Sequence, residues 1–161
     1  MILATVGTHN QGFERLVRAA DALAAGLEEP VVIQYGSSRY IPQHARAFAF
    51  TNGEEMADLV REARVVVSHA AAGSIILALR MGKPLVVVPR MKAYSEHFDD
   101  HQLQLARALG EAGRVVVVSQ PDLETLRQAI QQASGMAGWG GSPEQLVLAV
   151  SEQMIDWARR K

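Results

Sequence analysis

The sequence predicts an α/β domain with a doubly wound, mostly parallel sheet, and three observations lead to that fold class. Short apolar runs alternate with helical patterns along the whole chain of 161 residues. Several of the runs are β-branched and contain no polar residue, which is typical of strands covered on both faces. The connections are short, as in folds where a helix links each pair of parallel strands. We expect one Rossmann-like domain over residues 1–161, because a chain of this length forms one domain more readily than two.

The expected strands are the apolar runs, taken in order along the chain. The first, ILATV, opens directly after the initiator methionine, and the later runs VVV and VVVV are the most strongly β-branched. We expect strands at residues 2–6, 31–35, 47–50, 64–68, 85–88 and 114–118.

The expected helices fill the intervals between these strands. The helix that begins within SQPDLETL, residues 119–126, has the clearest start, because a serine, a proline and two acids surround its first turn. The segment SGMAGWGGSP at 134–143 is glycine-rich and predicts a loop before the last helix. We expect helices at residues 12–26, 53–63, 73–81, 99–112, 121–134 and 143–159.

The last helix carries a broad apolar stripe and ends in the basic sequence RRK. Two interpretations remain open: the stripe packs on the domain, or it docks a partner. The stripe consists of Leu146, Val147, Val150, Met154, Ile155 and Trp157.

The composition limits the possible functions. Hydrophobic residues make up 48% and charged residues 20%, and the net charge of −1 gives no basic field for nucleic acid or anionic lipid. The absence of cysteine excludes a disulfide scaffold, a thiolate zinc site and a cysteine nucleophile. No apolar run approaches the roughly 18–20 residues of a membrane span, and the N-terminus lacks a basic leader. We expect a cytoplasmic protein that reaches a membrane only through another molecule.

Polar residues gather where the expected strands end, which is where ligands bind in open α/β sheets. His9, His69, His97 and His101 follow the first, fourth and fifth strands, whereas His44 resembles an ordinary surface histidine.

The first such loop is VGTHNQGF, residues 6–13. Gly7 allows a tight turn, Thr8 offers a hydroxyl, and the next helix directs its N–H groups to the same place. The loop lacks the G-x-G-x-x-G pattern, and no acid ends the second strand, so a dinucleotide site is disfavoured. The alternative is a plain loop with a helix cap.

The second loop is SHAAAGSI, residues 68–75. Its small side chains allow a ligand to approach the backbone, and Gly73 and Ser74 open a helix whose free N–H groups suit a diphosphate. The alternative is that small residues only permit close packing of helix on strand. The sequence GKP at 82–84 is no phosphate loop, because it precedes a strand instead of opening a helix.

The third loop, PRMKAYSEHFDDHQ at 89–102, has many charged and polar residues directly after an apolar strand. A solvated surface is the alternative, but we interpret it as a binding loop that positions anions and hydroxyl groups. Its candidate residues are Arg90, Glu96, His97, Asp100, His101 and Gln102.

Two other chemistries have weaker support. His97 and His101, four residues apart, could share a helix face as metal ligands, with Asp100 or His69 as a third, but no second metal motif accompanies them. Ser74, His69 and an aspartate could imitate a hydrolase triad, but the G-x-S-x-G elbow is missing.

Together, VGTHNQGFERLV, SHAAAGSI…ALRMGKPLVVVPR and EHFDDHQ resemble the glycosyltransferase family 28 C-terminal domain. The closest resemblance is to its small members, the Alg13-like proteins and the bacterial exopolysaccharide subunits of the PssE/EpsF kind. The resemblance implies the C-terminal, donor-binding half of a GT-B glycosyltransferase. It implies inverting transfer of a hexosyl unit from a UDP-sugar to a lipid-linked acceptor in polysaccharide or glycolipid synthesis, with no essential metal and no cofactor. It also implies a separate membrane-anchored partner, which would recruit the chain to the inner face of the membrane and without which we expect it to be inactive.

The resemblance also assigns site residues by position. Gly7, Thr8 and His9 would line the diphosphate or the cleft, and His9 is the one candidate catalytic base, although the partner is expected to supply that group. The turn under the phosphates would be Ser68, His69, Gly73 and Ser74. The donor sugar and its phosphate would meet Arg90, Glu96, His97, Asp100, His101 and Gln102.

One position departs from the family pattern. Relatives carry a glutamate in the helix after the small-residue turn, as in GSILEAL, whose carboxylate pairs with the ribose hydroxyls. This chain has GSIILAL, with Leu77 at that position and Ala71 where a second glycine is common. Because leucine accepts no hydrogen bond, the ribose contact loses roughly 1.5–3 kcal/mol. The alternative function is therefore a non-catalytic binding or scaffold module of the same fold.

Overall fold

The computed structural model describes residues 1–136 and 140–160, and its centre is a six-stranded parallel sheet. The strand order is β3-β2-β1-β4-β5-β6, the order of a doubly wound fold, which confirms the predicted class. The strands are β1 (Ile2–Thr5), β2 (Val31–Gln34), β3 (Arg46–Phe48), β4 (Val65–His69), β5 (Leu85–Val88) and β6 (Val116–Val117).

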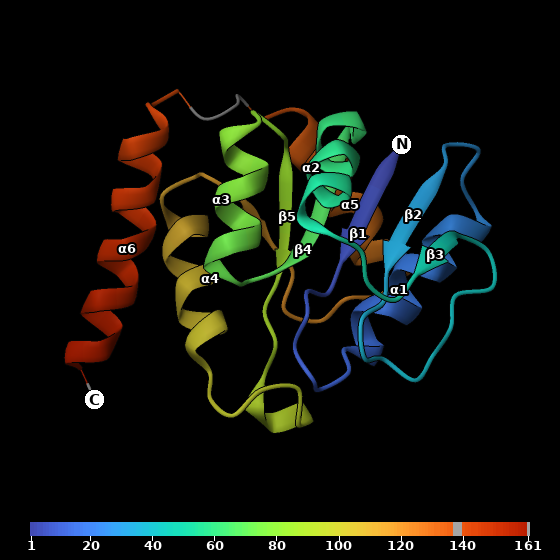
Figure 1. Ribbon diagram of the computed structural model, residues 1–161, viewed down its shortest axis with the longest axis horizontal. Helices are drawn as coiled ribbons and strands as arrows, with labels where there is room; N and C mark the ends of the chain where they lie inside the picture. Colours follow the sequence, from blue (N-terminus) through green and yellow to red (C-terminus); the bar gives the residue numbers. More distant parts are fainter. Residues whose placement is uncertain (137–139, 161) are drawn as a thin grey trace.

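Helices cover both faces of the sheet (Figure 1). One face packs against α1 (Glu14–Ala25) and α5 (Leu123–Ser134). The other packs against α2 (Gly53–Glu62), α3 (Ala72–Arg80) and α4 (His101–Glu111). The last helix, α6 (Pro143–Arg159), lies outside α3 and α4, and a short 3₁₀ helix, η1 (Lys92–Tyr94), follows β5.

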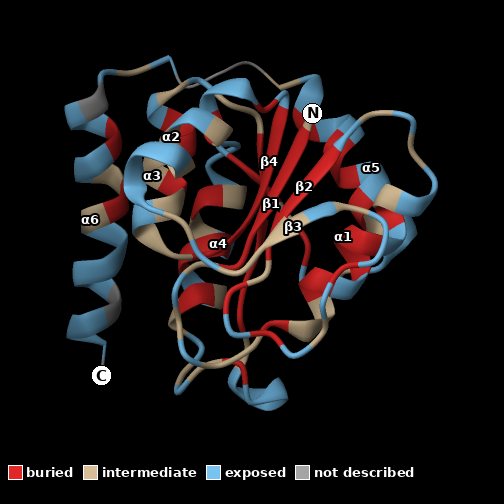
Figure 2. Cartoon of the chain, turned by 45° about the vertical axis from the view of Figure 1, so that its right-hand side comes forward, coloured by how far each residue is buried: buried red, intermediate tan, exposed pale blue. Residues whose placement is uncertain are grey.

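The strands alternate between two apolar clusters. Leu3, Val66 and Val87 face the cluster shared with α2, α3 and α4, whereas Val65 and Val67 face the cluster shared with α1 and α5. Figure 2 shows β1, β2 and β4 as a buried layer between helices whose outer faces are exposed, whereas the edge strand β3 is only partly buried. Burial on both faces explains why these strands appear in the sequence as unbroken apolar runs.

Several boundaries differ from the predicted ones. The strand expected at 47–50 is Arg46–Phe48, and the one expected at 114–118 is Val116–Val117, after which the Val118 N–H still donates to the Val87 carbonyl oxygen at 2.9 Å. The helix expected from residue 99 begins at His101, after η1. Of the loop predicted at 134–143, residues 137–139 lie outside the described part of the chain.

The apolar stripe of α6 is divided between core and surface. Leu146 and Val150 are buried in the cluster with α3 and α4. The exposed apolar residues of α6 are Val147 (39%), Leu148 (58%), Met154 (39%) and Ile155 (51%). The side chain of Trp157, which was predicted to belong to the stripe, lies outside the described residues.

The register brings the ends of the central strands to one level. Thr5 of β1 lies opposite both Gln34 of β2 and Ser68 of β4. The chain runs from β1 to β2 on one side and returns to β4 on the other, so the crevice of this fold opens between β1 and β4. Figure 1 shows α6 running toward the same end of the molecule as the loops that follow the strands. Among the described residues, no helix is long and apolar enough to cross a membrane.

Candidate functional site

The loop after β1 lies directly on the end of β4. Gly7 has a φ of +77°, and a Cβ atom there would lie 2.5 Å from both Cε1 and Nε2 of His69. Only glycine fits this position, because it needs both the left-handed conformation and the missing side chain. The structure therefore brings two of the predicted site residues, Gly7 and His69, into direct contact across the β1–β4 crevice.

A buried glutamine that the sequence analysis did not identify fixes the turn at Gly7. Gln34, at the end of β2, accepts hydrogen bonds from Thr5 Oγ1 (2.6 Å) and from the Gly7 N–H (3.0 Å) through its Oε1. Its Nε2 donates to the Gly7 carbonyl oxygen at 2.9 Å. One polar residue ending the apolar run VVIQY is the only sequence signal for this role.

His69 is buried and neutral at physiological pH. Burial, and then the positive charge of Arg90, lower the pKa of His69 to about 3. Its neighbour Ser68 has no exposed surface, and Ser68 Oγ donates to the His69 carbonyl oxygen at 3.0 Å. These two residues form the floor of the crevice.

The turn after β4 opens the amino end of α3. Ala71 is the N-cap and makes no side-chain capping bond, and the first turn of α3 carries no acidic residue. Gly73 is exposed and Ser74 is partly buried. Since the first N–H groups of a helix have no partner within it, this end favours an anion.

Leu77 lies one turn further along α3. It is partly buried and packs against the apolar cluster that Met56 and Leu59 of α2 also border. Leu77, which stands where the family pattern has glutamate, is therefore a packed side chain.

The loop after β5 brings a second histidine to the first loop. The rings of His9 and His97 have centroids 5.0 Å apart, and Phe98 contacts both rings at 5.7 and 6.0 Å. Burial first, then the charges of Arg90 and His97, lower the pKa of His9. Phe98 is 71% exposed and was not predicted to belong to the site.

Arg90, Glu96 and Gln102, which were predicted to meet the donor, are buried beneath the loops. Arg90 has no exposed surface, and its guanidinium donates to backbone carbonyl groups. Glu96 is 4% exposed and pairs with Arg15 at 2.6 Å. Gln102 Oε1 accepts the Arg90 N–H at 3.1 Å. Their polar groups bind the backbone of the loops and Arg15, and so stabilise the conformation of the site.

The remaining predicted residues lie at its rim. Thr8 and Asp100 are exposed, and Asp100 Oδ1 accepts the Lys92 N–H at 3.0 Å. His101 begins α4, and its N–H donates to Asp99 Oδ1 at 3.0 Å. Within residues 1–136 and 140–160, no three His, Asp or Glu side chains are grouped as metal ligands would be. The metal alternative therefore has no ligand set in that part of the chain.

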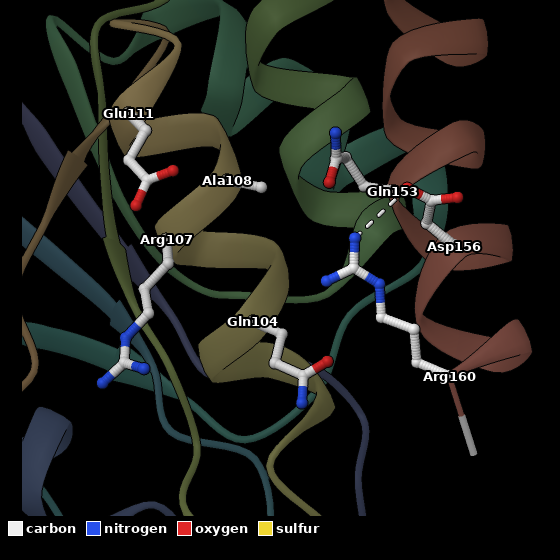
Figure 3. Close-up of a pocket in the computed structure, with 7 residues that line it drawn as sticks. All are labelled: Gln104, Arg107, Ala108, Glu111, Gln153, Asp156 and Arg160. Atoms are coloured by element: carbon white, nitrogen blue, oxygen red, sulfur yellow. Dashed lines mark ion pairs between the residues drawn. The ribbon is translucent and has the colours of Figure 1, made fainter.

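Two grooves lie near these elements. One, of about 620 Å³, lies beside the start of α1. It is lined by Glu96 of the predicted site, and by Arg39 and Tyr94. The other, of about 480 Å³, lies between α4 and the carboxyl-terminal half of α6 (Figure 3). None of the predicted site residues lines the second groove, where Asp156 and Arg160 of α6 form an ion pair at 3.7 Å.

A family model matches most of this chain, and two sequence relatives match about half of it. The family model of the glycosyltransferase family 28 C-terminal domain matches residues 1–136. The UDP-N-acetylglucosamine transferase subunit ALG13 of Cryptococcus neoformans is 46% identical over 77 residues, which are 47% of this chain and 36% of that protein. The UDP-N-acetylglucosamine–N-acetylmuramyl-(pentapeptide) pyrophosphoryl-undecaprenol N-acetylglucosamine transferase of Geobacillus kaustophilus is 35% identical over 89 residues, 54% of this chain and 24% of that protein.

A solved structure shares the fold. The NMR solution structure of ALG13 superposes with a TM-score of 0.59 at 21% identity, covering 92% of this chain and 94% of that one. The two sequence relatives are longer than the matched region, since the alignments span about a third and a quarter of their lengths.

Proposed function

The chain belongs to the family of the glycosyltransferase family 28 C-terminal domain, and from that premise we propose that it is the donor-binding subunit of an inverting glycosyltransferase. Its donor is a UDP-sugar, from which a hexosyl unit passes to a lipid-linked acceptor in polysaccharide or glycolipid synthesis. The observation that carries the proposal is the uncapped amino end of α3, which opens at the β1–β4 crevice beside the turn of small residues.

The names of the two relatives support the substrate classes. One names a UDP-N-acetylglucosamine transferase subunit, and the other names an acceptor joined through pyrophosphate to undecaprenol. A nucleotide diphosphate as leaving group agrees with an anion site at a helix terminus. We therefore assign the diphosphate to the first turn of α3, which contains Gly73 and Ser74.

The proposed reaction forms one bond and breaks one. An acceptor hydroxyl attacks the anomeric carbon opposite the diphosphate, the bond from that carbon to the phosphate oxygen breaks, and UDP leaves. The N–H groups of α3 stabilise the negative charge that grows on the leaving group. Among the residues of this chain, His9 is the candidate that accepts the hydroxyl proton, because its lowered pKa keeps the imidazole neutral.

Calorimetric titration with UDP tests the donor site. We expect binding in the micromolar to submillimolar range, and much weaker binding of uridine, which lacks the diphosphate. If UDP binds no better than uridine, the assignment of the diphosphate to α3 is wrong. Leu77→Glu serves as a second sample, because it restores a carboxylate for the ribose.

Transfer is proposed to need a membrane-anchored partner, and α6 is the surface that we assign to it. The exposed residues Leu148 and Ile155 lie seven positions apart, two helical turns, on a helix that buries Leu146 and Val150. A row of exposed apolar side chains on one helix is typical of an interface. The partner would hold the chain at the inner face of the membrane.

A transfer assay with membranes from the native cells tests the partner surface. We expect labelled sugar to enter lipid only when chain and membranes are combined, and the double variant Leu148→Asp/Ile155→Asp to abolish that transfer while keeping UDP binding. Gln153→Asp is the matched control, since it adds a negative charge to the same helix without removing apolar surface. Full transfer by the double variant would show that this face of α6 does not bind the partner.

The alternative is a non-catalytic binding or scaffold module, and Leu77 is the observation that favours it. A carboxylate partner for ribose is replaced by a side chain that packs against an apolar cluster. This alternative predicts no UDP binding by the native chain or by Leu77→Glu, together with retained association with native membranes.

A further inference from the structure

Arg90 occupies an unusual place for a charged residue. It follows β5 and Pro89, has no exposed surface, and lies with its guanidinium carbon 4.8 Å from the centroid of the Phe13 ring. Burial lowers its pKa to about 10, so it stays positively charged at neutral pH. A buried charge is costly unless hydrogen bonds satisfy it, and its partners therefore indicate its role.

Those partners belong to two different loops. In the loop after β1, Arg90 Nη2 donates to the Val6 carbonyl oxygen at 2.8 Å, and Nη1 donates to the carbonyl oxygens of Gln11 and Gly12 at 2.9 and 3.1 Å. In its own loop, Nη1 donates to the Glu96 carbonyl oxygen at 3.2 Å. Its Nε has no acceptor among the described residues, so the two terminal nitrogens make the contacts that join the loops.

A second link joins α1 to the loop after β5. Arg15 of α1 forms two hydrogen bonds with the Glu96 carboxylate, at 2.6 and 2.7 Å, and the Met91 N–H donates to that carboxylate at 3.1 Å. This pair crosses from α1 to the loop after β5. Within the described part of the chain, Arg15 makes no hydrogen bond to the carbonyl groups that Arg90 binds.

His9 and His97 are carried by the two loops that Arg90 joins. His9 lies between Val6 and Gln11, whose carbonyl groups Arg90 holds, and His97 directly follows Glu96. Their ring contact at 5.0 Å therefore depends on how the loops are held together.

We propose that Arg90 is a positioning residue of the donor site, which holds His9 against His97 by binding the backbone of both loops; this inference rests on the proposed function. Arginine suits the task because its planar fork reaches several carbonyl groups at fixed angles, whereas lysine presents one point charge. Arg90 itself touches no substrate in this arrangement.

NMR on the chain alone tests the proposal without an activity assay. Arg90→Lys keeps the charge and loses the fork, and Arg90→Gln loses both. We expect the nuclear Overhauser contacts between the His9 and His97 rings to disappear in both variants. Burial first, and then the charges of Arg90 and His97, lower the His9 pKa, so losing the contact should raise that pKa toward its ordinary value in both variants, and further in Arg90→Gln, which also removes the Arg90 charge. If Arg90 only supported overall stability, variants that stay folded would keep both the ring contact and the lowered His9 pKa.

Glu96→Gln is the matched control. It weakens the Arg15 pair in the same loop but spares the backbone bonds of Arg90, so the ring contact should persist. Loss of the contact in Glu96→Gln as in Arg90→Lys, or its retention in both Arg90 variants, would overturn the proposal.

UDP titration of the same samples separates this inference from the proposed function. The native chain should bind UDP, because the diphosphate is assigned to α3. If no sample binds UDP, the donor role fails, and the donor-site role of Arg90 fails with it, even where the ring contact depends on Arg90. Should both Arg90 variants fail to fold, proton exchange in the native chain decides. The Arg90 guanidinium must exchange far more slowly than that of exposed Arg39, and equal rates would disprove the buried contact.

Discussion

Replacing Gly73 by alanine should raise the stability of the chain while it weakens ligand binding. Gly73 is the second residue of α3, and a Cβ atom built there meets no atom within 4 Å. Alanine loses less backbone entropy than glycine on folding, so Gly73→Ala should stabilise the chain by about 0.5–1 kcal/mol. The same methyl group would occupy the space through which a diphosphate approaches the backbone. We expect UDP affinity to fall about tenfold, which corresponds to roughly 1.4 kcal/mol.

Urea unfolding followed by circular dichroism measures the first effect, and calorimetry with UDP measures the second. Gly53→Ala is the matched control, because Gly53 begins α2, where an added Cβ also meets no atom within 4 Å. This control should show a similar gain in stability with unchanged UDP affinity. A stabilised Gly73→Ala that binds UDP as tightly as the native chain would refute the assignment of the phosphates to this turn.

Three further predictions concern single positions. Gly7→Ala should destabilise the chain by at least about 2 kcal/mol, from the left-handed φ and the collision with His69; unchanged urea unfolding would show that the loop adapts. Asp21 is 1% exposed, and burial alone would raise the pKa of its carboxyl group. Hydrogen bonds outweigh burial and lower that pKa from 3.8 to about 2; the Gln43 N–H and the Tyr40 hydroxyl are among the donors. Its contribution of about 2 kcal/mol is complete above pH 3.8 and is lost as the pH falls through 2, so Asp21→Asn should remove the corresponding slope from stability measured across that range; an unchanged slope would contradict the assignment. Native chain should bind UDP and 2′-deoxyuridine diphosphate equally well, and Leu77→Glu should prefer UDP by about tenfold or more; equal binding by the variant would place the ribose elsewhere.

The sheet could be predicted from the sequence because its strands are buried on both faces. Apolar runs such as VVVS and LVVV have no other simple explanation, and the structure places them at β4 and β5. The lengths of the edge strands of the sheet, β3 and β6, were predicted less well. At β6, RVVVV has the composition of a long strand, but the strand covers only Val116 and Val117, since pairing depends on a neighbour that a local pattern does not contain.

The candidate site could be located from the sequence, but the direction of its side chains could not. Parallel strands bring their carboxyl ends together, so the contact of His9 with His97 follows from the order of the loops. Whether a polar side chain faces a ligand or the backbone beneath it depends on packing. Arg90 shows the difference, because a loop arginine usually remains solvated, whereas this one is covered by the loop after β1. Gln34 was missed for the same reason.

Leu77 joins the packing of the fold to the chemistry proposed for it. Its side chain borders the cluster that α2 and α3 share, where a carboxylate would have to turn outward or be desolvated. Glutamate at this position would add a ribose contact and weaken the packing of α3, whereas leucine does the opposite. If UDP binds as proposed, most of its binding energy must therefore come from the diphosphate at the start of α3. Specificity for the sugar and the acceptor would then rest on the loops that Arg90 joins and on the partner, and weak binding by the isolated chain is what such a division of labour predicts.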